Sequence, residues 1–178
     1  LAAVLEEASA AGAPLLLMVV SPAICGSVIA RFGTEEQKQR WLPGICDGTG
    51  TMAFAITEPD AGSDVAGIKT RAVRDGDEWI VNGQKVWTSG GQISDLGMLL
   101  ARTDPDVPKH KGISMFIVPT SSLGYKITPI MTVGNVRTNA TYYEDVRVPV
   151  GNLVGEENQG WNLITNQLNY ERVGLAPP

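Results

Sequence analysis

A short acidic segment, FAITEPDAGSDVAG (residues 54–67), carries the residue types of a ligand-binding turn. Glu58, Asp60 and Asp64 surround a proline and a glycine, directly after an apolar run. The segment is therefore a solvated turn, a calcium loop or a backbone nest shaped around a ligand. An EF-hand loop closes with a glutamate at its twelfth position, and counting from Asp60 that position holds Arg71, a cation. Calcium is therefore disfavoured.

The nest interpretation depends on hydrogen-bond donors. Consecutive backbone N–H groups in this turn, with the hydroxyls of Thr57 and Ser63, would point fixed dipoles at an electron-rich ring or a phosphate. The carboxylates would then orient the loop rather than touch an anion. Asp and Gly are common turn residues, so a purely structural turn remains open on this pattern alone.

A second segment, KVWTSGG (residues 85–91), ends a predicted strand with an indole, two hydroxyls and two glycines. Trp87 is either an ordinary core residue or a flat platform for stacking. A donor-rich turn and an aromatic plane, both at strand ends of one β region, together suit a flavin ring.

Helices are expected before these two segments. Residues up to about Gly48 are rich in Ala and Leu, and Gly33 is expected to cap the end of a helix. The TEEQ sequence (residues 34–37) predicts a capping box that opens another short helix. We expect Pro43–Gly44 to end that helix.

Strands are expected around the two segments, from about residue 51 to residue 150. Short β-branched or alternating runs are separated by turn signals, with hairpin turns predicted at Asp75–Gly76 and Asn82–Gly83. This pattern favours an antiparallel sandwich or barrel. A helix is predicted next, because Ile164, Leu168 and Leu175 recur with the helical period.

The predicted fold class is therefore α+β. We expect a helical segment over residues 1–48, an antiparallel β-barrel or sandwich middle domain over residues 49–152, and the start of a helical bundle over residues 153–178.

Composition narrows the class of protein. With 43% hydrophobic and 19% charged residues among 178, the chain has enough apolar material for a core. A net charge of −5 and a pI near 4.9 argue against nucleic acid or an anionic membrane as partner. Cys25 and Cys46 are interpreted as buried thiols in a reducing compartment.

The apolar stretch over residues 8–30 is interrupted by prolines and glycines, so we expect a buried helix rather than a membrane span. The chain begins at Leu1 without a methionine and stops at Pro178 in mid-pattern. We therefore expect it to be part of a longer protein.

Three segments resemble the acyl-CoA dehydrogenase family. They are FAITEPDAGSD (54–64), NGQKVWTSGG (82–91) and YYEDVRVPVGNLVGEENQGW (142–161), and the resemblance covers nearly the whole chain. TNQLNYERVGLAP (165–177) further resembles actinobacterial members that act on steroid side-chain thioesters.

The resemblance implies FAD as cofactor and assigns residues to it. The implied flavin contacts are Phe54, Ile56, Thr57, Gly62, Ser63, Trp87, Thr88 and Ser89. Ser63 also matches a contact to the pantetheine side of the thioester, and Asn169 and Arg172 match positions that meet coenzyme A. No metal is implied.

The implied activity is FAD-dependent α,β-dehydrogenation of an acyl-CoA thioester in lipid metabolism, with electrons passed to an electron-transfer flavoprotein. The resemblance also implies a homo- or hetero-tetramer, cytoplasmic or, in a eukaryote, in the mitochondrial matrix. One alternative is a non-catalytic partner subunit without its own flavin. Another is a β-sandwich binding module, which would leave the flanking helices unexplained.

Glu171 is the candidate catalytic base. A minority of the family places the base at the matching position, and Ile164, Leu168, Glu171 and Leu175 share one helical stripe. Burial of an unpaired carboxylate there is costly, so Glu171 is either functional or paired. An ion pair with Arg172 or another arginine, or a base located beyond residue 178, remains open.

Overall fold

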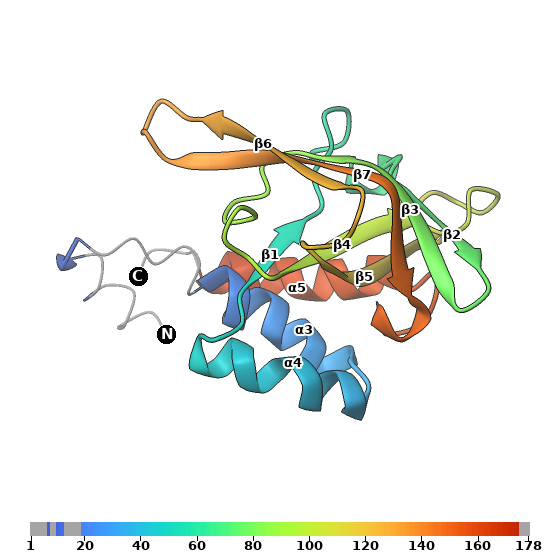
Figure 1. Cartoon of the computed structure of the whole chain (residues 1–178), viewed down its shortest axis with the longest axis horizontal. Coiled ribbons are helices and arrows are strands. Elements are labelled where there is room, and N and C mark those ends of the chain that lie inside the picture. The colour runs from blue at the N-terminus through green and yellow to red at the C-terminus, as the bar shows by residue number, and fades with distance from the viewer. Residues whose placement is uncertain (1–6, 8–9, 13–18, 175–178) are drawn as a thin grey trace.

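The computed structural model describes residues 7, 10–12 and 19–174, with the backbone alone for residues 19–20 and 169–174. The predicted α+β class is confirmed. Helices cover one side of an eight-stranded, mostly antiparallel sheet (Figure 1). Part of the apolar stretch over residues 8–30 lies outside the described residues. Among the described helices, none is long and apolar enough to cross a membrane.

From residue 19 onwards, the helical elements that precede the sheet are the π-helix η1 (Val19–Gly26), α3 (Ser27–Phe32) and α4 (Glu35–Asp47). The predicted capping box is confirmed at the start of α4. Thr34 Oγ1 accepts the backbone N–H of Gln37, and Gln37 Oε1 accepts the backbone N–H of Thr34. These reciprocal bonds satisfy donors that the first helical turn leaves free.

The prediction that Pro43–Gly44 ends this helix is wrong. Helix α4 continues to Asp47 and ends at Gly48, which has a left-handed φ of +80°. Pro43 lies on the exposed face, whereas Trp41 and Ile45 are buried in the core. Packing of the buried face therefore outweighs the backbone bond that proline cannot make.

The strands form one connected sheet in the order β6-β7-β3-β2-β4-β5-β8, with β1 paired in parallel to β4. Because β6 and β8 end this path, the sheet is open rather than a closed barrel. The strands are β1 (Met52–Ala55), β2 (Arg71–Asp75), β3 (Glu78–Lys85), β4 (Leu96–Arg102), β5 (Ile113–Pro119), β6 (Tyr125–Met131), β7 (Arg137–Pro149) and β8 (Leu153–Val154). Short 3-10 turns, η2 (Val65–Gly67) and η3 (Val150–Asn152), connect them.

Only one of the two predicted hairpin turns is correct. Asp75–Gly76 lies at the turn between β2 and β3, with Gly76 at φ +61°. Asn82–Gly83 instead lies inside β3, beside a register shift against β7. A Cβ on Gly83 would lie 2.5 Å from Thr70 Oγ1, so this glycine permits a close approach between segments rather than a turn.

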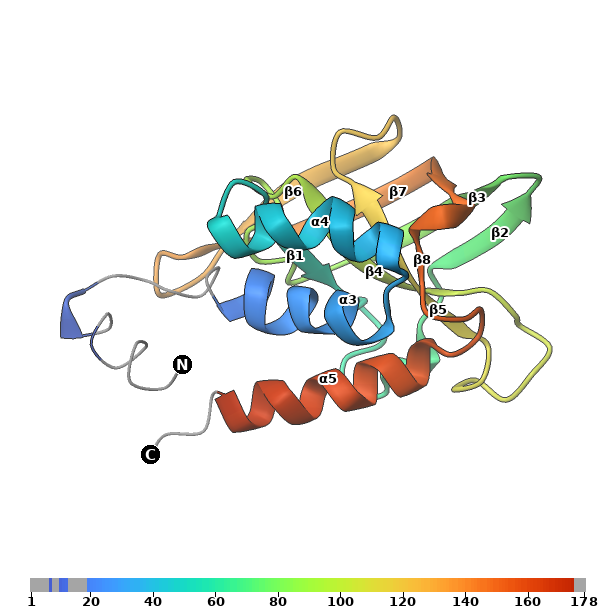
Figure 2. The ribbon, with the colours of Figure 1, turned by 90° about the horizontal axis from the view of Figure 1, so that it is seen from below.

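Strands β4 and β5 are buried on both faces and separate two cores. Leu99 and Phe116 face a core enclosed by the curled sheet, while Met98 and Ile117 face the helices. Helix α5 (Gly160–Gly174) lies against α3 on the helical side (Figure 2). The alternating side chains of a strand thus supply both cores.

The predicted helix is confirmed at Ile164 and Leu168, because both lie in α5, with Ile164 fully buried and Leu168 half-buried. Leu175, the third residue of that prediction, lies outside the described residues. The prediction of two buried thiols is half right. Cys25 is fully buried, and burial raises the pKa of its thiol well above the usual range. Cys46 is exposed, because it lies on the outer face of α4 next to the inward-facing Ile45.

Candidate functional site

The acidic turn is organised by Glu58. Its backbone exchanges two hydrogen bonds of 3.1 Å with Ala61, which closes a tight turn after β1. Its carboxylate is buried and accepts the backbone N–H groups of Lys69 at 2.7 Å and Thr70 at 2.9 Å. Nζ of Lys85 donates to the same carboxylate at 2.8 Å. These contacts agree with the expectation that the carboxylates orient the loop.

Lys85, at the end of β3, is fully buried. Its ammonium group donates to the carbonyl of Ile56 and to Glu58, each at 2.8 Å. Burial lowers the pKa of Lys85 to about 8, against the attraction of Glu58. For Glu58, burial opposes the charge, but attraction to Lys85 and the donated hydrogen bonds outweigh it and hold the pKa below its usual range. Both groups are therefore charged at neutral pH.

The other two carboxylates of the turn form exposed ion pairs. Asp60 pairs with Lys69 at 2.9 Å, and Asp64 pairs with Lys109 at 2.6 Å. Exposed pairs of this kind contribute little to stability. They nevertheless bring the turn to the start of β2 and to the loop before β5.

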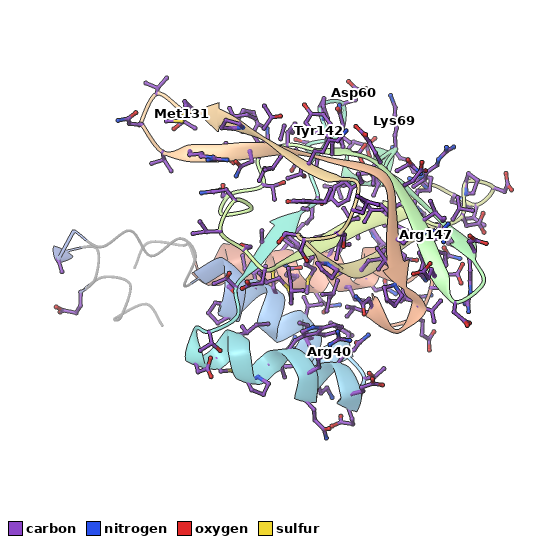
Figure 3. The ribbon with its side chains drawn as sticks, in the orientation of Figure 1. Arg40, Asp60, Lys69, Met131, Tyr142 and Arg147 are labelled. Atoms are coloured by element: carbon purple, nitrogen blue, oxygen red, sulfur yellow. The ribbon has the colours of Figure 1, made fainter. Side chains whose placement is uncertain are left out.

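A hollow of about 330 Å³ opens beside this turn. Figure 3 shows Asp60, Lys69 and Tyr142 on the face of the molecule away from Arg40 and the helices. The lining of the hollow carries both acidic and basic side chains. It consists of Glu58, Pro59, Asp60, Lys69, Thr70, Gly83, Gln84, Tyr142 and Glu144. The lining includes none of Thr57, Ser63 and Trp87, so the hollow and the predicted flavin contacts are different surfaces.

The predicted donors of the turn have no hydrogen-bond partner among the described residues. Thr57 is half-buried, and Gly62 and Ser63 are exposed. Within the part of the chain that the structure describes, the hydroxyls of Thr57 and Ser63 make no hydrogen bond. The backbone N–H groups of Thr57, Gly62 and Ser63 make none either. Unused donors at a strand end are what a ligand with acceptor atoms requires.

Trp87 directly follows Val86, whose backbone is hydrogen-bonded to Thr57. The backbone N–H of Val86 donates to the carbonyl of Thr57 at 2.8 Å. The Trp87 side chain is 57% exposed, so it is not an ordinary core residue. Its φ of +63° lies in the left-handed region, which is strained for a bulky side chain. Strain at such a position is typical of functional sites.

Strand β7 anchors the residues after Trp87. Thr88 is buried, and its backbone N–H donates to the carbonyl of Asn139 at 3.0 Å. Ser89 Oγ lies 3.1 Å from Thr138 Oγ1. Nδ2 of Asn139 in turn donates to the carbonyl of Thr88 at 2.9 Å. The turn is thus held from β7, while the indole stays exposed.

The remaining predicted site residues are more scattered. Phe54 is half-buried against the helix-side core, and Ile56 is buried in it. Asn169, Glu171 and Arg172 lie on α5, but their side chains are outside the described residues, so their roles stay predictions.

Two residues of the site were missed, Lys85 and Asn139. Lys85 had a readable signal, since it continues the alternation of Trp79 and Val81, both buried, along β3. A lysine in the inward phase of a strand is rarely buried without a partner, which points to a nearby carboxylate. Nothing in the local sequence around Asn139 distinguishes it.

The comparison with known families decides the class of protein. Residues 1–49 match the acyl-CoA dehydrogenase N-terminal domain, and residues 53–146 match the acyl-CoA dehydrogenase middle domain. The chain belongs to the acyl-CoA dehydrogenase family. The members of this family are oxidoreductases.

Relatives at about half identity extend over nearly the whole chain. It is 49% identical over 176 residues to acyl-CoA dehydrogenase FadE26 of Mycobacterium tuberculosis, covering 97% of this chain and 44% of that protein. The chain thus spans less than half the length of this relative. Acyl-CoA dehydrogenase FadE29 of the same organism is 51% identical over 173 residues, again covering 97% and 44%.

Solved structures agree with this assignment. The ChsE4–ChsE5 complex from Mycobacterium tuberculosis superimposes with a TM-score of 0.86 at 48% identity, covering 94% of this chain and 43% of that chain. The steroid acyl-CoA dehydrogenase Tcur3481–Tcur3483 superimposes with a TM-score of 0.87 at 52% identity, covering 89% and 41%.

Proposed function

We propose that the full-length protein is an FAD-dependent acyl-CoA dehydrogenase that introduces an α,β double bond into an acyl-CoA thioester. The observation that supports the proposal is the hydrogen bond from the backbone N–H of Val86 to the carbonyl of Thr57. It joins the residue before the exposed Trp87 to the turn that carries the unused donors. A flat aromatic face and free donors fit the ring of a flavin and its acceptor atoms.

The residues that would hold FAD are those of the two strand-end segments. Bound there, FAD would supply an acceptor for the hydride from the β-carbon. Thr57, Gly62 and Ser63 would donate hydrogen bonds, and Trp87 would cover the ring. Thr88 and Ser89 would contribute polar atoms held in place by β7. Phe54 and Ile56 would support this edge from the apolar side.

Substrate contacts are proposed for the loop and for α5. Ser63 would meet the pantetheine arm, and Asn169 and Arg172 the coenzyme A part. Glu171, on the stripe of α5 that buries Ile164, would remove the α-proton as general base. Such a base must reach the α-carbon from the side of the acyl chain opposite to the flavin.

The wider assignment follows the relatives. We propose three domain parts: the end of an N-terminal helical domain (1–48), a middle domain (49–152) and the start of a C-terminal helical domain (153–178).

A steroid acyl-CoA dehydrogenase among the similar structures favours a bulky side-chain thioester as substrate. A structure described as the electron transferring flavoprotein of Acidaminococcus fermentans, 36% identical with a TM-score of 0.83, supports such a protein as electron acceptor.

A hetero-oligomer is the second candidate, with this chain as a partner subunit that holds no flavin itself. The ChsE4–ChsE5 complex among the similar structures favours an assembly of two different chains. Thr57, Ser63 and Trp87, with their free donors and exposed ring, favour flavin binding by this chain. We further propose a tetramer in the cytoplasm.

Absorption of the purified full-length protein tests the proposal. A flavoenzyme is expected to show flavin bands in the visible range, and these should bleach when a suitable acyl-CoA is added without an electron acceptor. Addition of an electron-transfer flavoprotein should restore them. A colourless protein that takes up no FAD, alone or with its partner chain, would contradict the proposed function.

A further inference from the structure

The side chain of Lys85 makes two hydrogen bonds, to the residues on either side of Thr57. Its Nζ reaches the carbonyl of Ile56 and the carboxylate of Glu58. The following residue, Val86, bonds the carbonyl of Thr57 itself. Three bonds from Lys85, the last residue of β3, and from Val86 after it therefore hold the segment around Thr57, and Trp87 comes next in the chain.

Glu58 extends this arrangement to a third segment. Its two carboxylate oxygens accept the backbone N–H groups of Lys69 and Thr70, just before β2. The loop that carries Ser63 leaves Glu58 and returns at Lys69, so one carboxylate holds both ends of that loop. The exits of β1 and β3 and the entry of β2 thus meet at a single buried ion pair.

Neither member of the pair is able to contact a ligand extensively. Lys85 has no exposed surface, and Glu58 is 6% exposed. Desolvation offsets much of the attraction in a buried ion pair, so such a pair is weak evidence of added stability. Its effect is to select one arrangement of the segments that it joins.

We infer that Lys85 and Glu58 are positioning residues for the flavin ring, which act through the backbone of Thr57, the Ser63 loop and the turn at Trp87. The inference rests on the proposed function. The pair sets the separation between the hydrogen-bond donors and the indole, and that separation must match the width of one ring. A misplacement of about 1 Å in such a site is expected to be costly.

Variants of the full-length protein separate positioning from stability. Lys85→Met alone leaves a buried, unpaired carboxylate and is expected to destabilise the fold. The double variant Lys85→Met/Glu58→Gln removes both charges and is expected to fold. Its amide oxygen accepts one of the two backbone N–H groups that the carboxylate holds, and loss of the other bond is expected to lower the free energy of unfolding. Lys69→Met, which breaks the exposed pair with Asp60, is the matched control.

The readouts are the affinity of the apoprotein for FAD, the visible spectrum and the midpoint potential. In the double variant, FAD binding should weaken at least about tenfold, with a displaced flavin band and a shifted potential, under conditions where urea unfolding shows the protein to be folded. The control should match wild type in all of these. The inference would be overturned if the double variant kept the FAD affinity, the spectrum and the potential of wild type. That outcome would leave the proposed function intact. A wild-type protein that binds no FAD would overturn both.

Discussion

Lys85 loses all of its contact with water when the chain folds, and its charge is then supported by one carboxylate and one carbonyl. At the scale of single residues, the candidate site therefore contains a buried cation whose charge is opposed by desolvation and supported by Glu58. Trp87 is a second such residue, since its backbone is strained while its indole stays exposed. Both features lie within three residues of each other at the end of β3.

Lys85 predicts a specific response to alkaline pH. Because its pKa is lowered to about 8 in the folded state, the folded chain releases this proton before the unfolded chain does. The free energy of unfolding of wild type, relative to Lys85→Met, should therefore rise between about pH 8 and pH 10, by at most about 1.4 kcal/mol per pH unit. Urea unfolding across this range measures the difference. A parallel dependence on pH in the two proteins would contradict the prediction.

Trp87 predicts a difference between two small replacements. A left-handed φ costs an alanine about 1 kcal/mol more than a glycine, because only glycine lacks the Cβ. Trp87→Gly should therefore be more stable than Trp87→Ala by about that amount in thermal or urea unfolding. Both variants should lose affinity for FAD, since neither has a ring. Equal stability of the two would show that the left-handed conformation is not retained.

At the scale of elements, the two halves of β3 have different structural roles, and no sequence signal marks the boundary between them. Its first half pairs with β2 through a tight hairpin, and its second half passes close to the segment before β2 and ends at the site. The Asn82–Gly83 pair has the composition of a turn, yet β3 continues through it with a register shift against β7. The glycine is needed because Thr70, bonded to Glu58, occupies the space of a side chain.

Gly83→Ala should consequently destabilise the protein by about 2 kcal/mol, through a clash with Thr70 and an unfavourable φ of +149°. FAD affinity should fall as well, because Thr70 would shift together with Glu58. Gly151→Ala is the control, since no atom of the described residues lies within 4 Å of an added Cβ at that position. Unfolding midpoints and FAD titration measure both effects. A Gly83→Ala protein as stable as the control would rule out the close approach as the reason for this glycine.

At the scale of the whole molecule, α5 packs on the same side of the sheet as α3. Helix α5 contacts both α3 and β5, so a side chain on its buried stripe belongs to the same body as the β domain. The proposed base, Glu171, lies on this helix one turn beyond Leu168. The proposed flavin segments (54–67 and 85–91) and the proposed base thus come from separate parts of the chain.

Glu171→Gln tests that arrangement in the full-length protein. The variant should keep its flavin bands but lose turnover by at least about a hundredfold, because the amide cannot accept the α-proton. Glu157→Gln, the same change on the exposed loop before α5, should keep wild-type turnover. Full activity of Glu171→Gln would eliminate this residue as the base. Loss of stability without loss of turnover per folded molecule would instead indicate a structural ion pair.

Signals that act over a few residues were sufficient to predict the capping box at Thr34, the hairpin at Asp75–Gly76 and the helix through Ile164. They depend on backbone conformation and side-chain period, which neighbouring residues determine. The early end predicted for α4 was wrong because burial of Trp41 and Ile45 outweighed the local effect of Pro43. A local rule fails where packing against a distant element opposes it.

By itself, then, the sequence determined the order of helices and strands, the family, and the segments that carry the candidate site. Only the tertiary structure decided how those segments meet. Lys85 is 27 residues from Glu58, and Asn139 is 51 residues from Thr88, yet each pair is in direct contact. Such contacts depend on which strands pair and in which register, and this is settled by burial of the whole sheet rather than by the residues near either partner.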